Sequence, residues 1–368
     1  MKNLAIIDYD MSVVGGVEMV SSNLANELVK HYNVYLISLN NRNKLSAYSV
    51  DDKVHYFSIS NETNPHMRRT ILKTRKELRR ILRDNKIDLT LNMGTYASFV
   101  TVMNGFFLKK TKFIFCDHGA MINQIHDKKT TFMRKVSTVF SKHIVVLTDR
   151  SMNDYIEKFN VQPHKISRIY NWIDENIYEY ESEYNLKSHK IVSSGRFSSE
   201  KRYDLLIKVA IELKKMTSDW VWEIYGDGDE FKFIEECIKN NNLECQVVLK
   251  GLSDSMYNKY NDYSMLVLTS EREGLPLVLL EAKACKLPLI SFDIPTGPRE
   301  IINDCSDGYL ISPYDVRDMA SKIFYLLNND QTRQEFSNNS VKNIHQFSKQ
   351  LVLDKWIQLI EKVDKNGH

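Results

Sequence analysis

Two doubly wound α/β domains are the fold that this sequence predicts, and three features carry the prediction. Short apolar runs alternate with helix-like segments along nearly the whole chain, as in parallel sheets that are buried on both faces. A length of 368 residues exceeds the size at which one hydrophobic core keeps growing. A polar, acidic, tyrosine-rich stretch at residues 171–189 divides two alternating series. We therefore expect an α/β fold of two Rossmann-like domains that face across a cleft, with this stretch as the linker.

The first domain is expected over residues 1–170. Its first strand lies at residues 4–7, and a helix over residues 18–31 follows the glycine pair Gly15 and Gly16. Four further apolar runs are expected as strands of the same sheet: residues 34–38, 88–92, 112–116 and 143–147.

The second domain is expected over residues 190–344. It opens with a strand at Lys190, and a helix over residues 205–216 follows. Four more strands are expected: residues 220–225, 246–250, 265–268 and 287–292. Ligands of doubly wound sheets bind beyond the carboxyl ends of the strands, so the loops after these strands are the candidate site.

Composition excludes several classes of protein. The net charge of +3 is too small to indicate a nucleic-acid partner. The five cysteines are scattered, odd in number and without a CxxC pairing, which indicates a reducing compartment with neither a disulfide framework nor a zinc site. No apolar stretch approaches the roughly 18 residues that span a bilayer, and the first apolar run is too short for a signal peptide. We expect a cytoplasmic protein.

The most informative loop is residues 271–276, which a helix-like run over residues 277–284 follows. Glu273 and Glu281 are separated by slightly more than two helical turns, so both carboxylates can lie on one face if the helix starts near Gly274. Backbone N–H groups at such a start bind phosphate, and the carboxylates can hold sugar or ribose hydroxyls. The alternative is an amphipathic helix with two solvated glutamates.

Three more side chains follow predicted strands. Arg196 and Lys201 flank the entry to a helix, and two cations beside a helix N-terminus neutralise a diphosphate. His118 follows the strand at residues 112–116, where it can bond a substrate hydroxyl or act in proton transfer. Solvated surface cations and a structural histidine are the alternatives.

The glycine-containing loops disfavour a nicotinamide cofactor. Gly15 and Gly16 allow close approach of the backbone to a phosphate or sugar, but this loop does not contain the GxGxxG pattern. Residues 225–231 do not contain it either, because Phe231 stands where the third glycine would be. Two Asp-x-Asp strings are interpreted as structural or peripheral: Asp8 to Asp10 and Asp227 to Asp229. With cations placed to offset phosphate charge, no metal is expected.

Residues 65–86 form a basic amphipathic helix in this reading. Apolar side chains recur at helical spacing, at Met67, Ile71, Leu78 and Leu82, among many Lys and Arg residues. The functional interpretation is a contact with an anionic membrane surface, extended by the next basic stretch, which contains Lys128, Lys129, Arg134 and Lys135. A solvated outer helix is the alternative.

Seven motifs from both halves follow one another along the chain: GGVE at 15–18, CDHG at 116–119, VVLTDRS at 145–151, IYNWID at 169–174, GRFSSEK at 195–201, YGDGDE at 225–230 and EREGLPLVLLEA at 271–282. Taken together and in this order, they resemble the motifs of the large family 4 of retaining glycosyltransferases, which have the two-domain GT-B fold. The resemblance covers nearly the full length.

The resemblance implies roles for the second domain, which would bind the nucleotide-sugar donor. Arg196 and Lys201 would bind the donor diphosphate, Glu281 the ribose hydroxyls and Glu273 the donor sugar. Backbone recognition of the phosphates and the base would come from four residues: Gly251, Gly274, Leu275 and Pro276. Lys286 stands where relatives usually have glycine, so the turn after this helix departs from the family pattern.

The first domain would bind the acceptor. Gly15 and Gly16 would close on the donor, and His118 would hydrogen-bond the transferred sugar near its reacting carbon. A C-terminal helix within residues 345–368 would cross back and pack on this domain, as in similar enzymes.

The resemblance implies a retaining, metal-independent hexosyltransferase of cell-surface polysaccharide biosynthesis, such as capsule formation. The expected donor is UDP-hexose or UDP-N-acetylhexosamine, and the expected acceptor is a glycan or a lipid-linked oligosaccharide on the inner face of the membrane. The loop at residues 293–301 is similar to that of bacterial enzymes that build surface polysaccharides. A UDP-sugar epimerase of the same fold and a non-catalytic nucleotide-sugar-binding protein are the alternatives.

Overall fold

The computed structural model describes residues 1–40, 45–60, 67–105, 108, 110–119, 121–180, 183–253 and 255–365, with the side chains of these residues apart from 67–70 and 123. The chain forms two compact units. One contains residues 1–171 and the C-terminal residues from Leu353 onward, and the other is Trp172–Val352.

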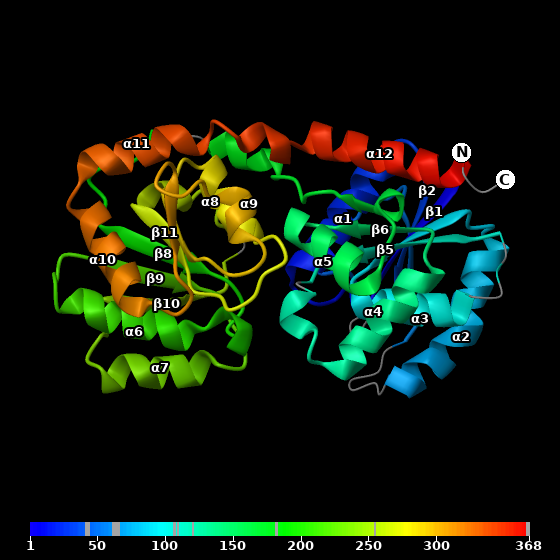
Figure 1. Ribbon diagram of the computed structural model, residues 1–368, viewed down its shortest axis with the longest axis horizontal. Helices are drawn as coiled ribbons and strands as arrows, with labels where there is room; N and C mark the ends of the chain where they lie inside the picture. The colour runs from blue at the N-terminus through cyan, green and yellow to red at the C-terminus, as the bar shows by residue number, and fades with distance from the viewer. Residues whose placement is uncertain are drawn as a thin grey trace. The chain divides into compact units, whose positions relative to one another are not determined.

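The first unit is built on a seven-stranded parallel sheet with the strand order β3-β2-β1-β4-β5-β6-β7. Its strands are β1 (Asn3–Asp8), β2 (Asn33–Ser38), β3 (His55–Ser58), β4 (Leu89–Met93), β5 (Lys112–Asp117), β6 (His143–Val146) and β7 (Ile166–Arg168). Its helices include α1 (Gly16–Leu28), α2 (Met67–Asp84), α3 (Thr95–Gly105), α4 (Lys128–Phe140) and α5 (Asp149–Phe159), with short 3-10 turns η1 (Ile122–Gln124) and η2 (Pro163–Lys165). Figure 1 shows helices on both faces of the sheet, which confirms the doubly wound prediction.

The predicted basic helix forms as α2, and residues 65–66 at its expected start lie outside the described residues. Leu78 and Leu82 are buried in a core with residues of β1, β2 and α3, and Ile71 packs against that core. The apolar stripe therefore faces the sheet, and most of the cations lie on the exposed side.

The second unit is built on a six-stranded parallel sheet with the order β10-β9-β8-β11-β12-β13. Its strands are β8 (Lys190–Ser194), β9 (Val221–Tyr225), β10 (Val247–Gly251), β11 (Met265–Leu268), β12 (Leu289–Phe292) and β13 (Gly308–Ile311). Its helices are α6 (Tyr203–Lys214), α7 (Phe231–Asn240), α8 (Leu277–Ala284), α9 (Pro298–Ile301), α10 (Val316–Leu327) and α11 (Asp330–Ser340), with 3-10 turns η3 (Glu175–Tyr180), η4 (Ser199–Lys201), η5 (Tyr260–Asp262) and η6 (Ile344–Phe347). The order reverses between β8 and β11, which is the point where doubly wound sheets bind ligands.

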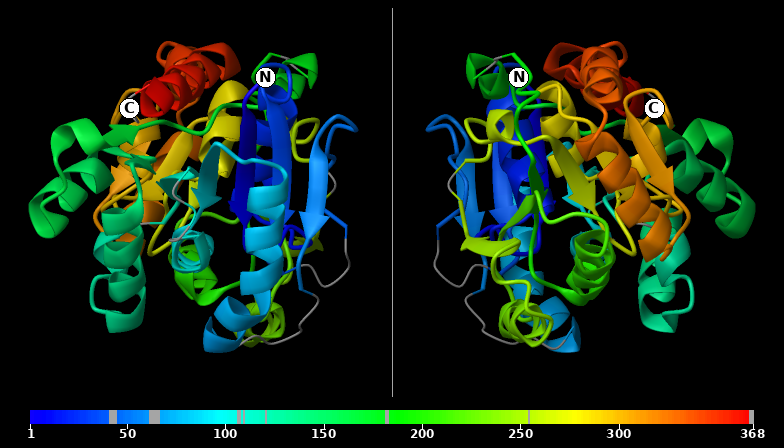
Figure 2. Two further views of the ribbon diagram at one scale, coloured as in Figure 1. Left: turned by 90° about the vertical axis from the view of Figure 1, so that its right-hand side faces the viewer. Right: turned by 90° about the vertical axis from the view of Figure 1, so that its left-hand side faces the viewer.

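Three strands were not predicted from the sequence, and each has a physical reason. β3 is the outermost strand in both views of Figure 2 and has no fully buried residue, so it lacks an apolar run. β7 has three residues, and β13 begins with Gly308, which is a poor strand former. The Gly308 backbone lies against β12, since a Cβ there would come within 2.2 Å of the Leu289 carbonyl oxygen.

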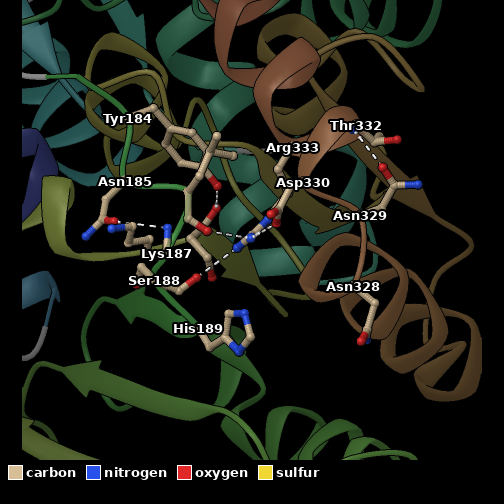
Figure 3. Close-up of polar contacts among 12 residues, drawn as sticks. Tyr184, Asn185, Lys187, Ser188, His189, Asn328, Asn329, Asp330, Thr332 and Arg333 are labelled. Atoms are coloured by element: carbon tan, nitrogen blue, oxygen red, sulfur yellow. Dashed lines mark hydrogen bonds and ion pairs between the residues drawn. The ribbon is translucent and has the colours of Figure 1, made fainter.

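The stretch expected as a linker, residues 171–189, folds onto the second unit from Trp172 onward. Arg333 of α11 is fully buried and donates to the carbonyls of Leu186 (2.7 Å) and Ser188 (2.8 Å). Figure 3 shows the Arg333 side chain pointing toward this segment, with Tyr184 nearby. Because one buried guanidinium satisfies two backbone carbonyls of this stretch, the stretch is part of the fold of the second unit.

The last helix, α12 (Lys349–Lys365), begins in the second unit and belongs to the first from Leu353 onward. Its end is fixed to the first unit by Asp364, which pairs with Lys2 (2.6 Å) and accepts a bond from Lys112 at its backbone oxygen (2.5 Å). Trp356 and Ile360 are buried on the inner side of the helix. Among the described residues, no helix is both long and apolar enough to cross a membrane.

Candidate active site

The loops after β8, β9 and β10 lie against one another at the carboxyl edge of the second sheet. The Gly195 N–H donates to the Tyr225 carbonyl (3.0 Å), and the Gly226 N–H donates to the Gly251 carbonyl (2.8 Å). A Cβ on Gly226 would lie 1.9 Å from the Gly195 carbonyl oxygen, so this contact requires glycine. The GDG segment is therefore a packing feature that fixes the loop of residues 195–201.

Lys201 and Glu273 meet at the point where the strand order reverses. The Lys201 ammonium lies 2.6 Å from Glu273 Oε1, and their side chains are 20% and 10% exposed. The two loops that carry them are joined through the backbone, since the Glu271 N–H donates to the Glu200 carbonyl (2.8 Å) and the Thr269 hydroxyl to the Lys201 carbonyl (3.1 Å). A cation and an acid predicted from separate motifs are thus direct neighbours.

The loop before α8 is held from its other side as well. The Thr296 hydroxyl donates to the Glu273 carbonyl (2.5 Å), and Gly297, at φ 100°, leaves room for Pro276. Gly274 is half-buried and Leu275 is buried. Pro276 is the N-cap of α8, and no side chain caps the helix there. Helix α8 coincides with the predicted run at residues 277–284, and its first turn has N–H groups for an anion. Because the helix does not start near Gly274, Glu273 lies before it, and the expectation that both carboxylates share one helical face is wrong.

Glu281 lies further along α8 and is held by a buried tyrosine. The Tyr260 hydroxyl donates to Glu281 Oε2 (2.9 Å), and the Tyr257 hydroxyl donates to Asp174 Oδ2 (3.2 Å) close by. Burial raises the pKa of Glu281 to about 7, the Tyr260 bond lowers it, and the charge of Asp174 raises it. The residue as a whole is half-buried.

Arg196 is solvent-exposed at the tip of the turn that Lys201 ends. The Ser198 N–H donates to the Arg196 carbonyl (2.9 Å), and the Lys201 N–H donates to the Ser198 carbonyl (3.0 Å). Gly251, the last residue of β10, has a φ of 70°, and within the described residues no heavy atom other than its own and its chain neighbours' lies within 4 Å of where its Cβ would be. Both residues are at the carboxyl edge of the sheet, as predicted.

His118 lies just after β5 of the first unit, in a turn that Asp117 organises. Asp117 Oδ1 accepts the Gly119 N–H (3.1 Å), and Asp117 Oδ2 accepts the Tyr155 hydroxyl (2.6 Å) and Arg134 Nε (2.9 Å). Among the described residues, none hydrogen-bonds the His118 ring. Burial lowers the pKa of His118 to about 4, so the imidazole is neutral near pH 7 and can hydrogen-bond a sugar hydroxyl.

The prediction that Arg134 extends a basic surface is wrong. Its side chain and that of Asp117 are each 1% exposed and form a buried ion pair. Lys128, Lys129 and Lys135 of the same stretch are exposed. Positions three and four apart share a face of a helix. Arg134 lies on the buried face of α4, and it was assigned to the exposed face because its side chain is charged.

The glycine pair of the first unit lies at the predicted helix start. Gly15 is the N-cap of α1, without a side-chain cap, and Gly16 is its first residue and exposed. The Asp8 carboxyl accepts the Ser21 hydroxyl (2.5 Å), and burial raises its pKa to about 6. Asp10 caps its own loop through Ser12.

The second Asp-x-Asp string is local as well, since the Asp227 carboxylate accepts the Gly228 N–H (2.8 Å). Within the described part of the chain, no group of three or more His, Cys, Asp or Glu side chains is arranged to hold a metal ion.

Three residues near Glu281 were not predicted from the sequence: Asp174, Tyr257 and Tyr260. Asp174 ends the IYNWID motif, so its place in a motif was the available signal. The two tyrosines lie in the stretch between β10 and β11, and Tyr260 is the first residue of η5. Two tyrosines spaced three residues apart match no binding motif, so the sequence did not point to them.

Two family models match the chain and together cover both units. Glycosyltransferase Family 4 matches residues 14–177, and Glycosyl transferases group 1 matches residues 175–343. The second of these ranges contains Lys201, Glu273 and Glu281, and the first contains His118.

Curated relatives carry bacterial glycosyltransferase names. A poly(ribitol-phosphate) alpha-N-acetylglucosaminyltransferase of Staphylococcus aureus is 34% identical over 59% of this chain, which spans 43% of that relative's length. An amylovoran biosynthesis glycosyltransferase of Erwinia amylovora is 27% identical over 98% of this chain and 100% of its own. An N-acetylgalactosaminyltransferase of Campylobacter jejuni, whose name specifies a diphospho-undecaprenol-linked substrate, is 27% identical over 95% of this chain and 96% of its own.

Solved structures share the fold. A mutant of S. aureus TarM, solved in complex with Fondaparinux, alpha-GlcNAc-glycerol and UDP, superposes with a TM-score of 0.82 at 18% identity, over 98% of this chain and 99% of that one. Anabaena HepE in complex with UDP and glucose superposes with a TM-score of 0.80 at 14% identity, over 97% of this chain and 99% of that one.

Proposed function

Because this chain belongs to the retaining glycosyltransferases of family 4, which have the GT-B fold, we propose that it transfers a hexose or N-acetylhexosamine from a UDP-sugar to a cell-surface glycan acceptor. The UDP in the structures of TarM and HepE supports the choice of nucleotide. The polymer and lipid-linked substrates in the names of the relatives support the acceptor class.

The observation that carries the proposal is the group of Lys201, Glu273 and the uncapped start of α8 at the reversal of the strand order. A diphosphate at this place would meet one ammonium group and the N–H groups of a helix start, with the exposed Arg196 guanidinium on the adjoining turn. Glu281 would accept the ribose hydroxyls, and Glu273 would contact the sugar. No metal ion is required for this arrangement of charge.

The transfer step that these groups support is a front-side displacement. The bond between the anomeric carbon and the phosphate oxygen breaks, and the electron pair leaves with the diphosphate, where Lys201 and Arg196 stabilise it. The acceptor oxygen bonds to the anomeric carbon on the same face, and its proton passes to the leaving phosphate oxygen. The neutral His118 imidazole would hydrogen-bond the sugar, and no protein carboxylate becomes a nucleophile.

A membrane-bound acceptor fits the cations of the first unit. Exposed Lys and Arg residues line α2, which packs beside α3, and α3 packs beside α4, whose Phe132 is 59% exposed. Anionic headgroups attract such a surface. Replacing Arg75 and Lys76 by Glu should reduce binding to anionic vesicles and leave binding to neutral vesicles unchanged. Arg79 is a poor choice for this test because it donates to the Asn104 carbonyl (2.5 Å).

The donor site is tested by Lys201→Ala, with Lys208→Ala as the matched control on the exposed side of α6. UDP-sugars should raise the melting temperature of the wild type and of the Lys208 variant, because a ligand of the folded state stabilises it. Lys201→Ala should lower turnover by roughly 100-fold or more, which corresponds to about 3 kcal/mol. Near-normal turnover of this variant would refute the assignment, and a donor sugar changed without acceptor would indicate an epimerase instead.

A further inference from the structure

Two residues influence the Glu281 carboxyl: Tyr260, which donates a hydrogen bond to it, and Asp174, which is acidic. Tyr260 is fully buried, and its hydroxyl occupies one carboxylate oxygen, Oε2, at 2.9 Å. No hydrogen bond within the described chain reaches the other oxygen, Oε1. Burial and the charge of Asp174 both raise the pKa of Glu281, and Asp174 is itself fixed by the Asn176 N–H (3.0 Å) and by the Tyr257 hydroxyl (3.2 Å). Asp174 immediately precedes η3, which packs against α8.

We infer that Tyr260 and Asp174 act on Glu281 in opposite directions and together decide the pH at which its carboxylate can accept the ribose hydroxyls of the donor. Tyr260 stabilises the ionised carboxylate by donating to it, and Asp174 destabilises it because two negative charges repel. Both are positioning residues that act through Glu281. This inference rests on the proposed function, in which Glu281 binds the ribose.

Other charged groups around α8 are mostly engaged elsewhere. Glu175 pairs with Lys349, Arg299 with Asp293, Lys259 with Ser253, and Lys283 with Asp307. Among the described residues, the remaining ionisable groups on the elements packed against α8, on the stretch before β11 and at the end of α8 itself are Tyr178, Glu179, Tyr180, Tyr257, Asp262, Tyr263, Cys285, Lys286, Glu300 and His345. After burial, the side chains that act on the Glu281 carboxyl are Tyr260 and Asp174.

The consequence is a donor affinity that rises with pH. A protonated Glu281 has one acceptor oxygen fewer, so it binds the ribose diol less well. Burial raises the pKa of Glu281 to about 7, so the change falls in the range of ordinary assays. Below the midpoint, the dissociation constant should increase by up to about tenfold for each pH unit.

The test is isothermal titration of UDP-N-acetylglucosamine from about pH 5.5 to about pH 8.5. A nucleotide sugar is used because each of its phosphates carries one ester and one anhydride bond and has no second ionisation, whereas the terminal phosphate of UDP has a second pKa of about 6. Tyr260→Phe should move the midpoint of the affinity profile up by about one pH unit, and Asp174→Asn should move it down by a similar amount. Glu281→Gln should bind weakly and without a midpoint.

Tyr263→Phe is the matched control, because Tyr263 is equally buried and donates to a different carboxylate, Glu223 (2.6 Å). Its loss should leave the midpoint in place. If the midpoints of the Tyr260 and Asp174 variants equal that of the wild type, the inference is overturned, while the assignment of the donor site still stands. If no UDP-sugar binds the wild type at any pH, the proposed function itself fails, and the inference fails with it.

Discussion

Replacing Glu281 by Gln should stabilise the enzyme measured without donor, and the gain should grow with pH. Burial raises the pKa of Glu281 from 4.5 to about 7. Between these values the folded state holds a proton that the unfolded state has lost, so stability falls as the pH rises through this window and levels off above it. Glutamine keeps an oxygen that can accept the Tyr260 hydroxyl and carries no charge to desolvate.

The magnitude follows from the width of the window. A shift of about 2.5 units corresponds to roughly 3 kcal/mol of lost stability at about pH 8, at roughly 1.36 kcal/mol for each unit. At about pH 5 the buried carboxyl is protonated, and the same calculation leaves less than about 1 kcal/mol. For a unit of this size, the difference amounts to roughly 4–10 °C in melting temperature.

Tryptophan fluorescence is the suitable readout because Trp172, Trp220 and Trp222 all lie in the second unit, with only Trp356 in the first. Melting curves of the wild type and Glu281→Gln should diverge from about pH 5 to about pH 8. Glu271→Gln, which removes a 48% exposed carboxylate from the neighbouring loop, should give no such trend. A gain that is the same at both pH values would refute the reasoning.

Three further predictions concern the second unit. Glu273→Gln should tighten UDP binding roughly threefold to tenfold, because it removes a negative charge beside the diphosphate. The same variant should slow transfer at least about tenfold. Weaker UDP binding of the variant in calorimetry would contradict this prediction. Lys286→Gly should stabilise the unit by about 1 kcal/mol in denaturant melts, because Lys286 has a φ of 62°, where a side chain is strained. Arg333→Met should destabilise it by roughly 2–4 kcal/mol in the same melts, because buried carbonyls lose their donor, and unchanged stability would show that the anchor is dispensable.

The fold was predictable where strands are buried on both faces. β1, β4 and β11 are mostly apolar and almost entirely buried, and their positions agree with the expected strands within one residue at each end. β3 and β7 escaped prediction because a half-exposed edge strand and a three-residue strand carry no such run. The packing of residues 171–189 onto the second unit could not be predicted from a local pattern either. Arg333, which binds two carbonyls of this stretch, lies far from them along the chain.

In the candidate site, motifs placed the residues and tertiary contacts decided their state. The turn after α8 illustrates the first point. Leu287 N–H donates to the Ala282 carbonyl (3.0 Å), and Lys286 N–H donates to the Lys283 carbonyl (3.0 Å), which is the bond pattern of a glycine-ended helix. Lysine at the glycine position was visible in the sequence, and the strain follows from it. Arg134 illustrates how tertiary contacts decide the state of a residue, because it is buried in an ion pair with Asp117 that forms only in the folded chain.

The charged groups of the proposed donor site are bonded to protein partners, and this determines how a donor must bind. Lys201 is bonded to Glu273, so a nucleotide sugar has to take over a paired ammonium group, whereas Glu281 keeps Tyr260 on Oε2 and can receive the ribose at Oε1. The diphosphate competes with Glu273 for Lys201, and in the proposed reaction the released Glu273 is then available to the sugar. Binding energy is thus used partly to separate an ion pair, which lowers ground-state affinity. The same ammonium faces a phosphate whose charge grows as the glycosidic bond breaks, so its interaction strengthens in the transition state.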